Sequence, residues 1–182
     1  MKREMIVVSC EVPMGAAIAA RLPGSHFSDC YRVGVADPSR TALEHVLDLF
    51  ADTPTWVSML MSIRNRAVSL VGLKNLGGLG QFDRTKPAAS YVAGDRVGIF
   101  SILSNTADEV LLGDDDKHLR VTLSLRKLAA TADAPPGVAL TTVVHIHNAL
   151  GRLYMLPVAP MHKLIAPAML ARIGVRRTDV PG

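Results

Sequence analysis

The chain has 182 residues, of which 49% are hydrophobic, 4% aromatic and 20% charged, and its formal net charge is +4 at pH 7. This length suits one domain with a substantial core, so we expect residues 1–182 to form a single domain. Few aromatic residues and dispersed lysines and arginines argue against nucleic-acid binding. No apolar run reaches the 18 residues of a membrane span. Two cysteines, Cys10 and Cys30, are too few for a disulfide framework and favour reduced thiols in the cytoplasm.

The first quarter of the chain predicts two short strands and a helix. β-Branched runs at residues 5–10 and 31–35 predict the strands. The helix begins either at Asp37, as an N-cap before a proline, or at a capping box formed by Thr41 and Glu44. The sequence alone leaves both starts open.

A second, longer helix is predicted between Pro54 and Gly72. The glycine-rich stretch at 77–80 follows a helix rather than a strand and has the spacing GGxG, so it is not a dinucleotide fingerprint. We expect residues 75–95 to form a flexible loop. The apolar spacing of the helix predicts one buried stripe, made of Trp56, Met59, Leu60, Ile63, Ala67 and Leu70.

An antiparallel meander is predicted next. Its strands are expected at residues 97–103, 109–112, 118–128 and 138–147, separated by turn-rich segments. In the last hairpin, a register that pairs Lys127 with Val138 also pairs Leu119 with Ile146, Val121 with Val144 and Leu123 with Thr142. A slip of one residue would separate these apolar faces, so the pattern selects this register.

A long helix is predicted after Asn148, whose side chain can cap the first turn. Pro157 and Pro160 predict a break, and the tail at 174–182 is expected to be poorly ordered. Strands, a helix pair, a meander and a last helix together predict an α+β fold, in which a curved antiparallel sheet wraps around a long kinked C-terminal helix. The expected buried stripe of this helix is Met161, Leu164, Ile165, Ala168 and Met169.

The predicted hairpin register brings histidines together near an acidic turn. It sets His118 opposite His147 and close to His145, with Asp115 and Asp116 just before. Three imidazoles beside carboxylates are a metal-ligand set, or could supply a general base. The same face also carries arginine, threonine and serine, which is typical of a solvated sheet surface, so both interpretations stay open.

Other polar residues have both a functional and an ordinary explanation. Arg64 and Arg66 could hold an anionic ligand or be solvated, and Arg152, Tyr154 and His162 could form a polar site near the helix break or satisfy local hydrogen bonds. The chain contains no GxSxG, HExxH or P-loop motif. We expect no bound cofactor.

Several segments between residues 22 and 173 form a family signature. They are PTWV at 54–57, LMSIRN at 60–65, GLK at 72–74, EVLLG at 109–113, DDKHL at 115–119, TVV at 142–144, HNALGRLY at 147–154 and PMH at 160–162. These segments resemble an uncharacterised bacterial family, domain of unknown function 2867, which is related to the START-like (SRPBCC) helix-grip superfamily. The resemblance implies a helix-grip fold, with a hydrophobic ligand between the sheet and the last helix, and an occasional link to nucleotide-binding reductase domains.

Three functions agree with these features, and whether the protein is an enzyme stays open. The first is binding of a small hydrophobic molecule, such as a lipid, polyketide or aromatic compound, between sheet and C-terminal helix. The second is an acid-base or metal-assisted enzyme that uses the histidine cluster. The third is a non-catalytic partner of a nucleotide-dependent reductase, and a homodimer is compatible with each. The expected ligand-lining residues are Trp56, Leu60, Phe100, Leu119, Val121, Leu123, Thr142, Val144, Leu164 and Ala168.

Overall fold

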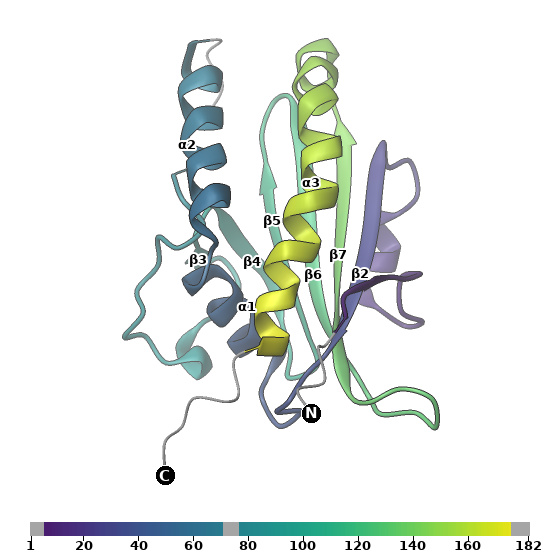
Figure 1. Cartoon of the computed structure of the whole chain (residues 1–182). Coiled ribbons are helices and arrows are strands. Elements are labelled where there is room, and N and C mark those ends of the chain that lie inside the picture. Colours follow the sequence, from purple (N-terminus) through teal and green to yellow (C-terminus); the bar gives the residue numbers. More distant parts are fainter. Residues whose placement is uncertain (1–5, 71–76, 176–182) are drawn as a thin grey trace.

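In the computed structural model, which describes residues 6–70 and 77–175, one curved sheet carries three helices on its concave side (Figure 1). The sheet is antiparallel throughout, with the strand order β1-β2-β7-β6-β5-β4-β3. The fold is therefore α+β, as the sequence predicts. The strands are β1 (Val8–Ser9), β2 (Phe27–Gly34), β3 (Arg96–Val97), β4 (Phe100–Asn105), β5 (Glu109–Asp115), β6 (Leu119–Leu128) and β7 (Gly137–Ile146).

The predicted meander and its register are confirmed. Lys127 pairs with Val138, and Leu119 pairs with Ile146. The last strand of the meander, β7, also pairs with β2 from the start of the chain. The two longest strands, β6 and β7, therefore lie in the middle of the sheet. Because side chains alternate along each strand, one set faces the helices and the other faces the convex side.

Two expectations fall partly outside the described residues. Of the loop expected at 75–95, residues 75–76 are not described, and residues 77–95 form an extended connection that contains a short 3-10 helix, η2 (Ala88–Ser90). Of the tail expected at 174–182, residues 176–182 are not described.

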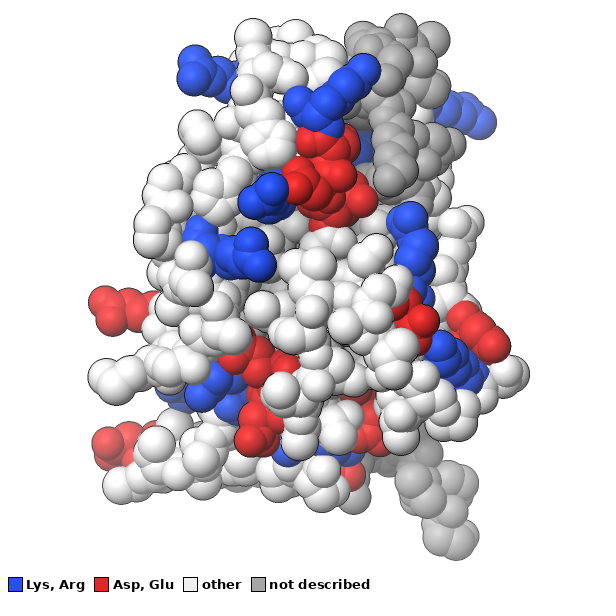
Figure 2. All heavy atoms as spheres, turned by 180° about the vertical axis from the view of Figure 1, so that it is seen from behind, with Lys and Arg blue, Asp and Glu red and all other residues white. Residues whose placement is uncertain are grey.

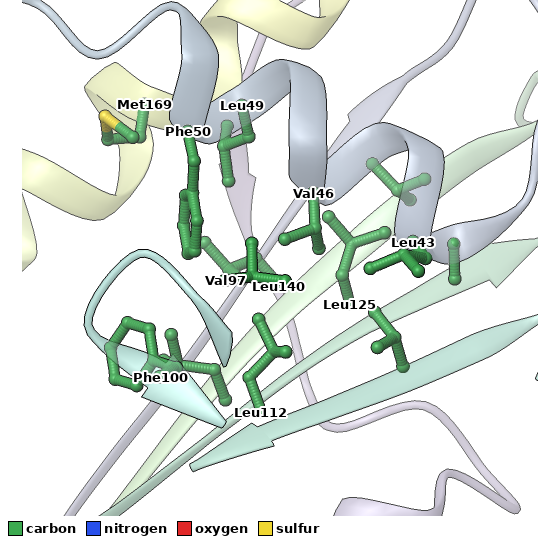
Figure 3. Packing of buried hydrophobic residues seen from close by; sticks show 14 of the residues in the cluster. Leu43, Val46, Leu49, Phe50, Val97, Phe100, Leu112, Leu125, Leu140 and Met169 are labelled. Carbon is green, nitrogen blue, oxygen red and sulfur yellow. The ribbon is translucent and has the colours of Figure 1, made fainter. Parts of the chain in front are cut away.

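Helix α1 (Ala42–Ala51) begins at the capping box, the second of the two predicted starts. The Glu44 amide donates to Thr41 Oγ1 over 3.2 Å, and the Thr41 amide donates to Glu44 Oε2 over 2.7 Å. The helix lies across the lower end of the sheet (Figure 1), and Phe50 points toward Phe100 (Figure 3), with 6.0 Å between ring centroids. This packing forms the main core. Its labelled members are Leu43, Val46, Leu49, Phe50, Val97, Phe100, Leu112, Leu125, Leu140 and Met169.

Helix α2 (Thr55–Leu70) begins in the core, where Val57 is fully buried, and then extends away from α1 (Figure 1). The predicted buried stripe is wrong for Trp56, Met59 and Ile63, which are exposed, with 59% of Met59 accessible. Spacing identifies residues that share a helix face, but not what lies opposite that face. Beyond its first turn, α2 turns Leu60, Met61 and Arg64 toward the cavity, and Met61 also packs against the core.

Helix α3 (Ala149–Val175) runs along the concave face over β2 and β7. The predicted break is wrong, because the helix continues through Pro157, Pro160 and Pro167. Each proline leaves the carbonyl four residues earlier without its helical donor. Those carbonyls belong to Leu153, Leu156 and Lys163, which are all exposed, so water can replace the missing donors.

The face of α3 that contacts the sheet also differs from the expected stripe. Met169 is buried, but Leu164 is 68% exposed and Ala168 is half-buried. The buried residues are instead Met155, Ala166, Met169 and Leu170. The segment Ala149–Ile173 is long and apolar enough to cross a membrane, with a mean hydropathy of 1.2 over its best window. Core helices of soluble proteins share that composition, and here α3 packs against the sheet.

The convex face of the sheet is covered by η1 (Ala17–Arg21), a 3-10 helix that is held by Glu109. The Glu109 carboxylate accepts hydrogen bonds from the Ala17 amide (2.8 Å), Ser124 Oγ (2.7 Å) and Arg126 Nη1 (2.8 Å). Burial alone would raise the pKa of Glu109, but these donors outweigh burial and lower it. Seen from behind, acidic and basic side chains form small mixed groups, and uncharged surface separates one group from the next (Figure 2).

Replacing Glu109 with glutamine should lower the free energy of unfolding by about 1–3 kcal/mol, because a buried carboxylate that accepts several hydrogen bonds is lost. The lowered pKa means that Glu109 stabilises the fold above about pH 4.5, and that this contribution disappears as the pH falls through the folded-state pKa. Urea unfolding between pH 3 and pH 7 should therefore show a flatter acid limb in E109Q. The control is D108N, because the Asp108 side chain is largely exposed. Equal stability of the two variants would contradict this account.

Candidate functional site

A cavity of about 470 Å³ lies between the concave face of the sheet and the three helices. Sheet residues form its floor, α1 closes one end with Val46, Leu49 and Phe50, and α2 and α3 form its sides. Most of the wall is aliphatic or aromatic. The wall residues from β6 and β7 are Leu119, Val121, Leu123, Leu125, Leu140, Thr142 and Val144.

The structure brings seven of the ten predicted lining residues to this wall. They are Leu60, Phe100, Leu119, Val121, Leu123, Thr142 and Val144. Trp56 and Leu164 are exposed, and Ala168 is half-buried, so these three lie away from the wall. The sheet positions were predictable because the hairpin register fixes which side chains share a face. The helix positions depended on the orientation of each helix, which spacing does not fix.

Arg64 and Tyr154 join α2 to α3 at the edge of the cavity. Arg64 Nε donates to the Tyr154 hydroxyl oxygen over 3.0 Å, and the guanidinium carbon lies 5.4 Å from the Tyr154 ring centroid. Arg64 Nη1 also donates to Asn65 Oδ1 over 2.9 Å. Arg64 and Tyr154 line the cavity, whereas Arg66 and Arg152 are exposed. The positive charge of Arg64 thus lies at one polar end of an apolar space.

A second polar group lies on the wall further along α3. His162 Nε2 is 2.9 Å from Thr142 Oγ1 and 3.4 Å from Asp29 Oδ1. Asp29 pairs with Thr142 across β2 and β7, so both project from the same face of the sheet beneath His162. The Phe27 ring meets the His162 ring edge-on, with centroids 5.7 Å apart. Three elements therefore fix the imidazole.

Asp29 is unusual among the residues of this face. Its side chain is only 9% exposed, and neither carboxylate oxygen has a hydrogen-bond partner of good geometry. The nearby Tyr31 shows the effect of this charge, because burial and then the Asp29 carboxylate raise the pKa of Tyr31. A buried carboxylate with so few partners is costly to maintain, and such groups concentrate at functional sites.

Sequence reasoning did not identify Asp29, because the second strand was expected to begin only at Tyr31. The strand begins at Phe27, which makes Asp29 an acidic residue at an inward-facing position between Phe27 and Tyr31. An acidic residue at an apolar position of the alternation was the available signal. His162 was among the candidates, together with Arg152 and Tyr154, but these three do not form one group.

The predicted histidine cluster does not come together. His118 lines the cavity and its Nδ1 is 3.2 Å from Asn148 Oδ1, whereas His145 Nε2 is 3.2 Å from the Pro23 carbonyl oxygen. His147 Nδ1 is 3.0 Å from the Asp116 carbonyl oxygen, and Asp115 Oδ1 is 3.9 Å from His147 Nε2. The backbones of His118 and His147 do lie side by side, since the His147 amide donates to the His118 carbonyl oxygen over 2.8 Å, but their rings turn to different partners. Within residues 6–70 and 77–175, no group of three or more histidine, cysteine or acidic residues could hold a metal ion.

The start of α3 is fixed above the cavity by Asn148 and Gly151. Asn148 Oδ1 accepts from the Gly151 amide over 3.1 Å, as expected of an N-cap. A Cβ on Gly151 would collide with the carbonyl oxygen of His118 and lie 3.0 Å from the Ile146 side chain. Only glycine therefore lets the helix approach the sheet this closely.

Replacing Gly151 with alanine should destabilise the protein, although alanine normally favours a helix by up to about 1 kcal/mol. The collision involves backbone, so we expect a net loss of about 1–3 kcal/mol, typical of overpacking. Thermal unfolding measures this loss. Gly78→Ala is the control, because its Cβ would meet nothing nearer than 3.7 Å. An unchanged or higher Tm for G151A would show that α3 is not held by this contact.

Comparison with known proteins gives one family match and several partial ones. The family model described as "Protein of unknown function (DUF2867)" matches residues 21–169. Chaperone protein HscA from Serratia proteamaculans (strain 568) is 33% identical over 109 residues, and HscA from Yersinia pseudotuberculosis serotype I (strain IP32953) is 33% identical over 110 residues. These matches cover 60% and 57% of this chain, but the chain spans only 16% of the length of either chaperone. No solved structure matches the chain.

Proposed function

We propose that this chain, which belongs to the family described as protein of unknown function (DUF2867), binds a small hydrophobic molecule between its sheet and α3. The observation that carries the proposal is the cavity of about 470 Å³ with a mainly apolar wall. Pockets for small molecules typically have this size and combine an apolar lining with a few polar groups. The same arrangement supports a relationship to the START-like (SRPBCC) helix-grip superfamily.

The apolar wall of the cavity supports an occupant. The cavity is partly open to solvent, so in the absence of a ligand its wall is in contact with water. Each Å² of apolar surface left in water costs roughly 25 cal/mol relative to its burial, and water in the cavity would find few hydrogen-bond partners on an aliphatic wall. A hydrophobic ligand would bury this surface and replace the poorly bound water.

The expected affinity sets the concentration range for an assay. A ligand that buries about 400 Å² of apolar surface gains roughly 10 kcal/mol at 25 cal/mol per Å². Lost translational and rotational freedom costs at least about 4 kcal/mol. The remaining 6 kcal/mol or so corresponds to a Kd in the range of tens of micromolar.

The alternative of an enzyme built on the histidine cluster has less support. It required His118, His145 and His147 to converge, and their rings instead engage Asn148, the Pro23 carbonyl and the Asp116 carbonyl. No contact within the described residues favours the third alternative, a partner subunit of a reductase. Ligand binding is therefore the function that the geometry supports best.

A cavity-filling substitution tests the proposal. Val121 is half-buried on β6 and lines the cavity, so V121F should place a ring in the ligand space. The measurement is a fluorescence titration with the neutral apolar probe N-phenyl-1-naphthylamine. Wild type should bind the probe at micromolar concentrations, and V121F should bind it at least about fivefold more weakly.

The matched control is V92F, because Val92 is 62% exposed and lies outside the cavity wall. Probe binding should be the same in V92F and wild type. If the probe fails to bind wild type, or binds V121F and V92F equally, the cavity is not the ligand site.

A further inference from the structure

The arrangement of Asp29, Thr142 and His162 limits what the imidazole can bind. The polar contacts of His162 involve Nε2, and among the described residues no hydrogen-bond partner is present on Nδ1. Asp29 makes no hydrogen bond of good geometry with the imidazole, but its negative charge, 3.4 Å from Nε2, favours the tautomer with the proton on that nitrogen. Thr142 Oγ1, at 2.9 Å, can then accept the hydrogen bond from Nε2. Nδ1 then keeps a lone pair, and His162 can accept a hydrogen bond from a donor in the cavity.

The charges around the cavity argue against an anionic group at this position. Such a group would lie next to the Asp29 carboxylate, which is itself only 3.4 Å from His162 Nε2. Among the described residues, Arg64 is a lysine or arginine that lines the cavity, and it is bonded to Tyr154, eight residues before His162 on α3. Eight residues are about 12 Å of helix, so the positive charge is held about two turns of α3 away from His162, whereas the Asp29 carboxylate is next to it.

We propose that His162, positioned by Asp29 and Thr142, accepts a hydrogen bond from the hydroxyl group of an uncharged, otherwise apolar ligand. This inference rests on the proposed function and specifies its ligand class as hydrophobic alcohols and phenols, not carboxylates. A phenol or alcohol brings both the donor that Nδ1 lacks and an apolar body for the aliphatic wall. Its hydroxyl oxygen carries no charge, so Asp29 does not repel it.

Three compounds with the same ring system separate these contributions. 2-Naphthol carries a hydroxyl group, 2-methoxynaphthalene carries the oxygen without its proton, and 2-naphthoate carries a negative charge. Each is measured by displacement of bound N-phenyl-1-naphthylamine at pH 7. Wild type should bind 2-naphthol about fivefold to tenfold more tightly than 2-methoxynaphthalene, as expected for one net hydrogen bond. 2-Naphthoate should bind most weakly.

Variants assign the preference to named side chains. In H162L the advantage of 2-naphthol should disappear, while 2-methoxynaphthalene binds within about twofold of wild type. In D29N the affinity for 2-naphthoate should rise severalfold, because the opposing charge is removed. H145L is the matched control, since His145 lies outside the cavity wall, and it should keep the wild-type ranking.

A second substitution keeps the test valid if H162L does not fold, which circular dichroism would show. T142V retains the imidazole but removes its nearest partner, so it should reduce the preference for 2-naphthol without loss of probe binding. Equal binding of all three compounds to wild type, or an undiminished preference for 2-naphthol over 2-methoxynaphthalene in H162L or T142V, would overturn the assignment of His162 while leaving the proposed function intact. Failure of the probe itself to bind wild type would overturn both.

Discussion

The apolar concave face of the sheet is the constraint on which the rest of the structure depends. Strands β6 and β7 alternate so that leucine and valine side chains face the helices, and this face must be removed from water. Helix α1 covers the lower end through Phe50 and its neighbours, and α3 covers the β2 and β7 side. Helix α2 starts in the core and then extends away from it (Figure 1). The space left between this face and the three helices is the cavity, and the sheet forms its floor.

The close approach of α3 to the sheet fixes one side of the cavity. Gly151 places the first turn of the helix against the His118 carbonyl, and the prolines direct their unpaired carbonyls outward. The buried Met155 lines the cavity together with the half-buried Met161 and Ile165. Helix α3 therefore contributes to the core and to the side of the cavity at the same time.

The sheet was predictable from the sequence to the level of individual residue pairs, whereas the helices were not. The pairing of Lys127 with Val138 follows from a period of two, because a slip of one residue exposes every apolar side chain of the hairpin. A helical stripe has no such penalty, because a rotation exchanges some apolar contacts for others. That is why Leu164 was expected inside and is exposed, and why Trp56 was expected on the cavity wall and is not. The candidate site divides in the same way, with its strand residues anticipated and its Asp29–His162 pair assembled by tertiary packing.

Asp29 is a charged residue at a strand position where the fold favours an apolar one. An apolar residue there would pack beneath His162 without the cost of burying a charge, and the strand pattern from Phe27 to Tyr31 would be uniform. The carboxylate contributes little to stability, since the structure gives it no hydrogen bond of good geometry. Its one close polar neighbour is an imidazole on the wall of an apolar cavity. Sites that break the rules of packing in this way, while the rest of the sequence obeys them, are where function is expected, and the orientation of His162 is what Asp29 provides.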